Sequence, residues 1–196
     1  MKKSFANKSD QELVDEVREG GKNSSRAFEA LYDRYSDRVF TYCSKVFSSH
    51  PDVAQDIFQD TFEKFYEVIK KDRIEIKNLS AYLIKVARNL SINEKSKKSS
   101  NEISIDGMDF EFVDRNQENK ELNEIIHLGI EALPDEFKEV LVMKEFMDMS
   151  YQEISEALEI DMSLIRVRIF RAKQKLKKIL EPYLNDFYYT DNKVIG

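Results

Sequence analysis

The chain has 196 residues, which is enough for one large domain or two small ones. It contains only 5 glycines and 3 prolines, and 35% of its residues are charged, so a fold of many short strands and tight turns is excluded. The net charge of -6 disfavours a nucleic-acid partner only if charge is spread evenly, yet residues 162–180 carry seven lysines and arginines and no acid. We therefore expect an all-α protein with a localised basic surface.

Four amphipathic helices are predicted in the first half of the chain. Their apolar residues recur at three- and four-residue steps, which places these residues on one face of each helix. Capping residues, a proline and a glycine pair mark the boundaries, and we expect helices over residues 9–20, 25–48, 50–70 and 79–95. The acidic stretch 99–121 has no sustained helical repeat and is predicted to be a flexible linker.

The last third of the chain predicts a helix-turn-helix. An apolar segment, 122–132, and a helix that opens at Pro134 precede a capping box formed by Ser150 and Glu153. A short helix, a tight turn and a final helix follow, and the final helix combines an apolar inner face with an outward basic row. This order favours duplex DNA binding, although an ordinary solvated basic helix would show the same charge run.

Two further helical faces carry chemistry. On the fourth helix, a polar side combines basic groups with an aromatic ring and an amide, which suits single-stranded or melted DNA. The residues of this side are Tyr82, Lys85, Arg88 and Asn89. The third helix carries a candidate protein-docking surface, here called the acidic row, which consists of Asp56, Gln59, Asp60 and Glu63. For both faces, plain solvation is the alternative.

Other kinds of chemistry find little support in the sequence. Cys43 is the single cysteine and lies on the apolar face of the second helix, so it is expected to pack and not to react. Two isolated histidines do not make a zinc site, and no glycine-rich loop or nucleophile accompanies a carboxylate pair, so we expect no metal, no cofactor and no enzymatic activity. No apolar run approaches the ~18 residues of a membrane span, so we expect a cytoplasmic protein without membrane insertion.

Several motifs resemble those of bacterial sigma factors of the extracytoplasmic-function type, which consist of two helical domains called region 2 and region 4. Residues 27–35 (AFEALYDRY) are similar to the start of region 2. Residues 54–62 (AQDIFQDTF) are similar to the segment that docks on the clamp of core RNA polymerase. The resemblance implies that Asp56, Gln59 and Asp60 contact the polymerase.

The resemblance extends to two helices that face DNA. Residues 79–89 (LSAYLIKVARN) are similar to the helix that grips the minus-ten element of the promoter, and the loop 71–78 would hold a base flipped from the melted strand. The minus-ten contacts implied are Tyr82, Lys85, Arg88 and Asn89. Residues 166–173 (RVRIFRAK) are similar to the segment that recognises the minus-thirty-five element. The contacts implied there are Arg166, Arg168, Phe170, Arg171 and Lys173.

The chain departs from the family pattern at several positions of these helices. Tyr82 replaces a tryptophan and keeps an aromatic ring. Leu164 and Val167 replace a threonine and a serine of the recognition helix, which removes two hydroxyls able to bond phosphate or base. Glu159 stands where the turn often has glycine, so a differently shaped turn is expected.

These observations predict two small helical domains joined by a flexible acidic linker. Residues 1–98 would form region 2, 99–121 the linker, 122–184 region 4 and 185–196 a tail. The predicted function is that of a sigma factor, which binds core RNA polymerase, recognises both promoter DNA elements and promotes DNA melting. The resemblance also implies an anti-sigma factor as a second protein partner.

Three other functions fit parts of the sequence less well. A stand-alone helix-turn-helix regulator would bind duplex DNA without polymerase, and the region 2 motifs disfavour it. A helical enzyme would need a pocket with convergent carboxylates, which the sequence does not offer. An inhibitor that binds sigma factors would not carry both DNA-facing helices.

Overall fold

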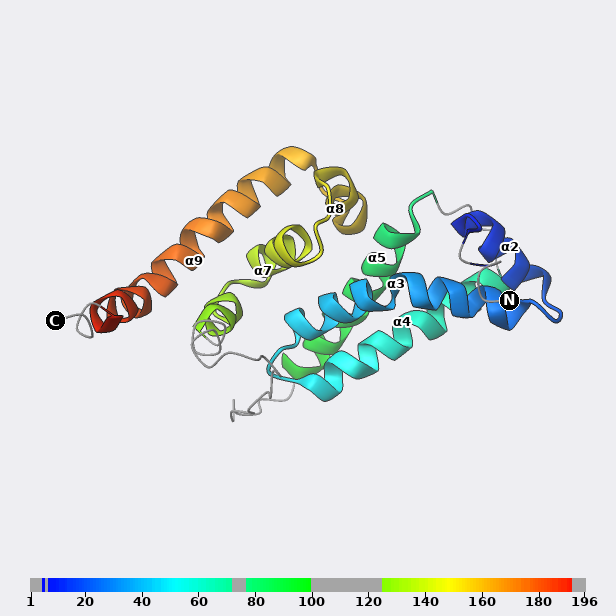
Figure 1. Ribbon diagram of the computed structural model, residues 1–196, viewed down its shortest axis with the longest axis horizontal. Helices are drawn as coiled ribbons and strands as arrows, with labels where there is room; N and C mark the ends of the chain where they lie inside the picture. The colour runs from blue at the N-terminus through cyan, green and yellow to red at the C-terminus, as the bar shows by residue number, and fades with distance from the viewer. Residues whose placement is uncertain (1–4, 6, 72–76, 100–124, 192–196) are drawn as a thin grey trace.

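A computed structural model describes residues 5, 7–71, 77–99 and 125–191, and every regular element within these residues is a helix (Figure 1). In chain order the elements are α2 (Asp10–Glu19), α3 (Ser24–Val46), α4 (Pro51–Lys71), α5 (Leu79–Ser99), α7 (Asp135–Leu141), the π-helix η1 (Val142–Phe146), α8 (Tyr151–Leu158) and α9 (Met162–Asp191). Residues 125–131 are also helical. The all-α prediction is confirmed, while the predicted linker from residue 100 onward lies outside the described residues.

Helices α2 to α5 form one group around an apolar core. Ser9 and Glu12 form the predicted capping box at the start of α2, in which the Ser9 amide donates to the Glu12 carboxylate at 2.7 Å and the Glu12 amide donates to the Ser9 hydroxyl at 3.3 Å. The hydrogen bond from the Ser9 amide lowers the pKa of Glu12. The largest side chains of this core are fully buried and include Leu13, Leu31, Tyr42, Phe65 and Leu83.

Helices α7, η1, α8 and α9 form the second group, which contains the predicted helix-turn-helix. Ser150 and Glu153 form a second capping box at the start of α8. Glu159, which follows α8, has the left-handed backbone conformation (φ 57°) that glycine favours, although it is a glutamate. The Ser155 hydroxyl donates to the Ile160 carbonyl at 2.7 Å and fixes the turn into α9.

Two helices are longer than predicted. Helix α5 runs to Ser99 and not to residue 95, and α9 runs to Asp191, beyond the predicted end of region 4 at residue 184. The extension of α5 is polar, and that of α9 groups its three aromatic residues in one run, 187–189, so neither shows a sustained apolar repeat. Each continues a long helix, however, and adding residues to an existing helix avoids the cost of nucleating a new one.

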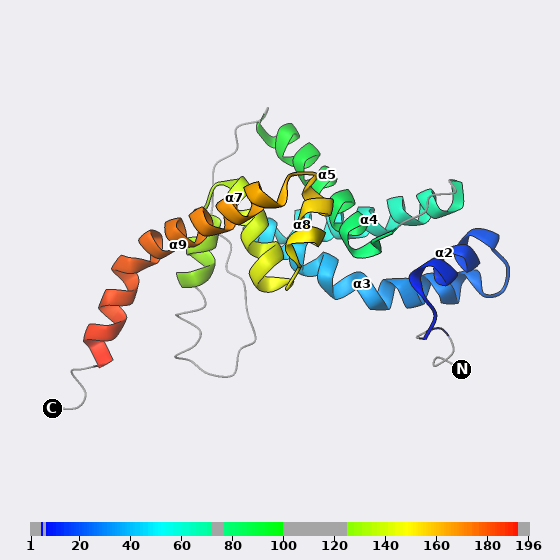
Figure 2. The same cartoon turned by 90° about the horizontal axis from the view of Figure 1, so that it is seen from above.

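The two groups pack against each other, with α8 beside α5 and η1 beside α3 (Figures 1 and 2). Buried apolar residues from both groups form one continuous cluster. The cluster includes Ile84 of α5, Ile154 of α8 and Met149, which precedes α8. Each of them is at most 1% exposed. Helix α5 is therefore covered by both groups. The apolar periodicity of a single helix does not reveal the second of these contacts.

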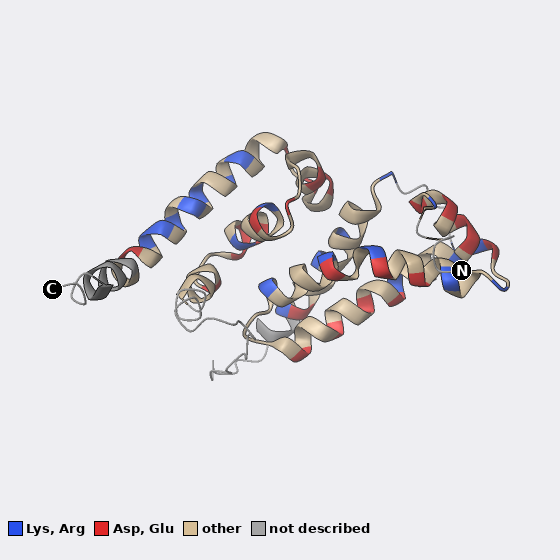
Figure 3. Cartoon of the chain, viewed as in Figure 1, with Lys and Arg blue, Asp and Glu red and all other residues tan. Residues whose placement is uncertain are grey.

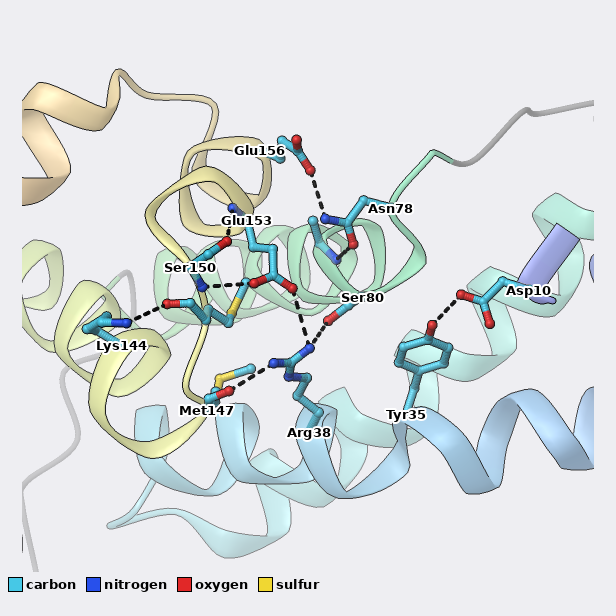
Figure 4. A network of polar contacts seen from close by, with 12 residues as sticks. Asp10, Tyr35, Arg38, Asn78, Ser80, Lys144, Met147, Ser150, Glu153 and Glu156 are labelled. Atoms are coloured by element: carbon cyan, nitrogen blue, oxygen red, sulfur yellow. Dashed lines mark hydrogen bonds and ion pairs between the residues drawn. The ribbon is translucent and has the colours of Figure 1, made fainter. Parts of the chain in front are cut away.

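Arg38 of α3 joins three elements at this interface (Figure 4). Its guanidinium donates to the Ser80 hydroxyl of α5 at 2.8 Å and to the Met147 carbonyl at 3.0 Å. The same guanidinium lies 3.6 Å from the carboxylate of Glu153 on α8. One side chain thus connects both helical groups through a charge and two hydrogen bonds.

A buried carboxylate lies at the same interface. Glu139 of α7 accepts hydrogen bonds from the Arg88 guanidinium of α5 at 3.0 Å and from the Tyr42 hydroxyl of α3 at 3.4 Å. Only 12% of the Glu139 side chain and 26% of the Arg88 side chain are exposed. Burial, together with the charge of Glu139, raises the pKa of Tyr42 well above its usual value, so the hydroxyl keeps its proton and donates.

Replacing Glu159 with glycine should stabilise the fold, because a left-handed conformation costs a residue with a Cβ atom about 1 kcal/mol. We expect Glu159→Gly to raise the free energy of unfolding by about 0.5 to 1 kcal/mol, measured by urea denaturation followed with circular dichroism. Glu159→Gln is the matched control, since it removes the charge and keeps the strained backbone. A glycine variant no more stable than the glutamine variant would contradict this reading of the turn.

Removing the buried carboxylate of Glu139 should cost more stability than removing an exposed interface charge. Glu139→Ala leaves Arg88 and Tyr42 without their acceptor, and we expect the free energy of unfolding to fall by about 2 to 3 kcal/mol. Lys85→Ala removes a more exposed ion pair with Glu159 and should cost about 0.5 kcal/mol. Equal losses in the two variants, in the same denaturation experiment, would show that Glu139 does not anchor the interface.

Candidate docking and nucleic-acid interfaces

The acidic row of α4 is a continuous exposed strip. Asp56, Gln59, Asp60 and Glu63 recur at three- and four-residue steps, which places them on one side of the helix. All of them are exposed, whereas Ile57 on the other side is buried. Figure 3 shows the acidic residues spaced along α4. The strip therefore offers negative charge to a partner without disturbing the core.

A groove runs beside the acidic row, between α4 and α5. Its lining consists of Val53, Asp56, Ile57, Asp60, Lys64, Leu90, Asn93, Glu94 and Ser96. Two members of the acidic row, Asp56 and Asp60, thus belong to the groove as well as to the strip. The combination of apolar and acidic lining suits a basic partner segment that also inserts an apolar side chain.

The two predicted minus-ten cations are engaged by the second helical group. The Lys85 ammonium donates to the Glu159 carboxylate at 2.6 Å, and the Arg88 guanidinium donates to Glu139 at 3.0 Å. The first pair is at the protein surface, whereas the second is largely buried. In the described arrangement these cations therefore stabilise the interface between the groups and are not free to bind phosphate.

The other two predicted minus-ten residues differ in exposure. Asn89 is exposed on α5. Tyr82 is half-buried, and its ring centroid lies 6.2 Å from that of Phe65 in the core of the first group. The aromatic ring predicted to stack on a base thus has a packing role as well.

The predicted base-holding loop is described only at its ends, since residues 72–76 lie outside the described residues. Asn78 caps α5, because its side-chain oxygen accepts a hydrogen bond from the Ala81 amide at 3.1 Å. Its side-chain amide donates to the Glu156 carboxylate of α8 at 2.8 Å (Figure 4). The end of the loop is therefore also attached to the second group.

Basic residues follow one another along α9, as Figure 3 shows. The exposed residues among those predicted to face the minus-thirty-five element are Arg166, Phe170, Arg171 and Lys173. Phe170 is 62% exposed, which is unusual for a large aromatic side chain. Arg168 is half-buried and forms an ion pair with Glu136 of α7 at 3.0 Å, and the exposed Lys173 forms an ion pair with Glu145 at 2.8 Å.

The sequence patterns did not identify the contacts between the two groups, neither those of Arg38 nor that of Tyr42 with Glu139. Tyr42 and Glu139 are 97 residues apart, and Arg38 is 109 residues from Met147. Helical periodicity reports which face of one helix is apolar, so it cannot pair side chains on distant helices. The available signal was the position of Arg38 at the edge of the apolar stripe of α3, next to the buried Val39.

Cys43 is fully buried, and burial raises the pKa of its thiol to about 12, so it packs as predicted.

Within residues 5, 7–71, 77–99 and 125–191, no group of three His, Cys, Asp or Glu side chains is arranged to hold a metal ion. None of the helices in this described part has an apolar segment long enough to cross a membrane.

Two family models match the chain in sequence order. The model described as Sigma-70 region 2 matches residues 31–101, and the model described as Sigma-70, region 4 matches residues 123–176. The first match contains the acidic row and the polar side of α5. The second contains the helix-turn-helix and the basic residues of α9 from 166 to 173.

Similar proteins match over nearly their whole length. The RNA polymerase sigma-H factor of Pseudomonas aeruginosa is 26% identical over 190 residues, which is 90% of this chain and 96% of that protein. The ECF RNA polymerase sigma-E factor of Haemophilus influenzae is 26% identical over 189 residues, which is 89% of this chain and 97% of that protein.

Two solved structures share the fold. The sigma factor RpoE from Bartonella quintana, in complex with the anti-sigma factor NepR, has a TM-score of 0.65 at 18% identity, over 79% of this chain and 96% of that one. CnrH, in complex with the cytosolic domain of CnrY, has a TM-score of 0.64 at 21% identity, over 88% and 97%. Both regions match in sequence order, and the similar proteins span both of them. The chain therefore belongs to the sigma-70 family, as a sigma factor of the extracytoplasmic-function type.

Proposed function

We propose that the protein binds core RNA polymerase and directs it to promoters, without catalytic residues of its own. It recognises the minus-ten and minus-thirty-five elements and promotes DNA melting. The observation that carries this proposal is that one chain of this family presents an exposed acidic row on α4 and an exposed basic face on α9. Residues 1–98 act as region 2, 122–184 as region 4 and 99–121 as the linker between them.

The acidic row is the polymerase-docking surface. Asp56, Gln59 and Asp60 contact the clamp, and the neighbouring groove accepts an apolar side chain of the same partner. Exposed charges of this kind mainly set the association rate and the orientation of the partner. The apolar lining of the groove adds affinity through burial.

The polar side of α5 binds the minus-ten element. Lys85 and Arg88 neutralise phosphates, Asn89 bonds to a base or phosphate, and Tyr82 supports an unstacked base. The loop 71–78 captures a base flipped from the melted strand. Flipping a base costs a few kcal/mol, so a site that binds the flipped base drives local melting without ATP.

The basic face of α9 binds the minus-thirty-five element. Arg166, Phe170, Arg171 and Lys173 are exposed and reach the DNA directly. In the described arrangement Arg168 and Lys173 also form ion pairs, with Glu136 and Glu145. Together the cations of this helix supply the sequence-independent attraction to phosphate.

The described arrangement has to open before both elements are bound. The two promoter elements are centred about 25 base pairs apart, which is about 85 Å along the duplex. The Lys85 ammonium, however, lies 2.6 Å from Glu159, and Glu159 immediately precedes the turn into α9. The two DNA-binding surfaces are therefore held next to each other, and binding to a promoter requires that the Lys85 and Arg88 pairs break.

An anti-sigma factor is the proposed regulatory partner. In support, the structurally similar Bartonella quintana sigma factor was solved with an anti-sigma factor. Covering the acidic row or the face of α9 would block polymerase or promoter binding directly. The proposed place of action is the cytoplasm, where core polymerase and promoter DNA are found.

Truncating two side chains of the acidic row should weaken binding to polymerase. The purified full chain is mixed with sigma-free core RNA polymerase and separated by size exclusion, and we expect the wild type to co-elute. Gln59→Ala/Asp60→Ala should weaken the complex by about tenfold or more, because it removes two central contacts of the docking surface.

Asp33→Ala, on the exposed side of α3, is the matched control, because it also removes one negative charge and should leave co-elution unchanged. A wild-type chain that elutes alone while still shifting duplex DNA would overturn the sigma-factor function. The stand-alone helix-turn-helix regulator would then take its place.

Removing the acids that hold the minus-ten cations should increase DNA affinity. In Glu139→Gln/Glu159→Gln, Lys85 and Arg88 lose their charged partners and become available to phosphates. We expect a mixed-sequence single strand of about 20 nucleotides to bind about three- to tenfold more tightly at low salt, measured by fluorescence anisotropy.

Glu136→Gln/Glu145→Gln makes the same change in net charge but frees Arg168 and Lys173 of α9. It should raise single-strand affinity much less than the first variant does. Equal gains in both variants would mean that net charge alone controls binding and that the interface does not mask the minus-ten side.

A further inference from the structure

One row of side chains on α9 changes character along the helix. Its members recur at three- and four-residue steps, which places them on a single side. They are Leu164, Val167, Arg171, Gln174 and Lys178, and all of them are exposed. The first two are apolar and the other three are polar or basic, so the row is apolar only at its N-terminal end.

The N-terminal end of this row is where a recognition helix meets base edges. In a helix-turn-helix, the first residues of the second helix enter the major groove, and later residues approach the backbone. Helix α9 begins at Met162, so Leu164 and Val167 lie in its first two turns. They are 42% and 43% exposed, whereas Ile165 between them is fully buried, so both side chains point away from the core.

Leu164 and Val167 cannot read the polar groups of a base, because neither side chain donates or accepts a hydrogen bond. The apolar group that a base presents in the major groove is the C5 methyl of thymine, which aliphatic side chains contact. We propose that Leu164 and Val167 are specificity-determining residues that recognise thymine methyl groups in the minus-thirty-five element. This inference rests on the proposed binding of α9 to promoter DNA.

The charge along α9 itself favours DNA over a protein as the occupant of the apolar pair. Arg166 lies between the two residues in the sequence, Arg171 follows them on the same row, and both arginines are exposed. Lys178 lies about three turns beyond Val167 on that row. Residues 162–180 contain seven basic residues and no acid. Glu156, Glu159 and Asp161 lie beside Leu164 on the side of α8, so the cations border the pair only along α9, where a thymine methyl would lie next to a phosphate backbone.

Replacing thymine with deoxyuridine tests the proposal, because the two bases differ only by the C5 methyl. Holoenzyme assembled from the full chain and core RNA polymerase first selects duplexes from a pool with a randomised minus-thirty-five region. Each thymine of the enriched motif is then replaced in turn. We expect binding to weaken about fourfold at one or more positions, the effect of losing one buried methyl group.

The variants Leu164→Ser and Val167→Ser should bind thymine and deoxyuridine equally at the position that each residue reads, because serine has no methyl group to contact that of thymine. Both residues are exposed, so these substitutions do not disturb the core. Lys178→Ala is the control, since it should weaken binding to all duplexes alike, lower the salt dependence and keep the preference for thymine.

Equal binding of thymine and deoxyuridine by the wild type, within a clearly enriched motif, would overturn the inference and leave promoter binding intact. The apolar pair would then be a contact for a protein partner. Failure to form the holoenzyme, or to enrich any motif, would overturn the proposed function itself, and the reading of thymine with it.

Discussion

The buried carboxylate of Glu139 is the contact on which the arrangement of the two helical groups depends. A charge removed from water has to keep its partners, and here those partners are Arg88 and Tyr42 of the other group. Arg38 adds a second connection between the same two groups, from α3 to Met147 and to Glu153 of α8. Because Arg88 is also a proposed minus-ten contact, the interface and the DNA compete for the same guanidinium, and stability of the closed arrangement is linked to DNA binding.

The distribution of charge, more than its total, explains how an acidic protein serves as a DNA-binding factor. The chain carries a net charge of -6, yet its acids are spread over α2, α4, the interface and the stretch 99–121, while the outward side of α9 is basic. Each surface then attracts a partner of opposite sign.

Local features were predictable from the sequence because they depend on residues within a few positions of one another. The capping boxes at Ser9 and Ser150 and the packing of Cys43 are confirmed. The contact of Arg88 with Glu139 could not be predicted, since periodicity describes one helix and this contact joins two helices 51 residues apart. The polar side of α5 was therefore expected to face melted DNA or solvent, whereas its cations Lys85 and Arg88 meet acids of the second group. Roles in polymerase and DNA binding remain predictions.

Energy transfer between dyes on the two groups most directly tests whether the chain opens when it acts at a promoter. Dyes are attached to cysteines introduced at Asp33 of α3 and Lys177 of α9, both exposed, while the buried Cys43 stays unlabelled. We predict that the transfer efficiency falls when core polymerase and promoter DNA are added. An unchanged efficiency in a complex that synthesises run-off transcript would contradict the separation of the two groups.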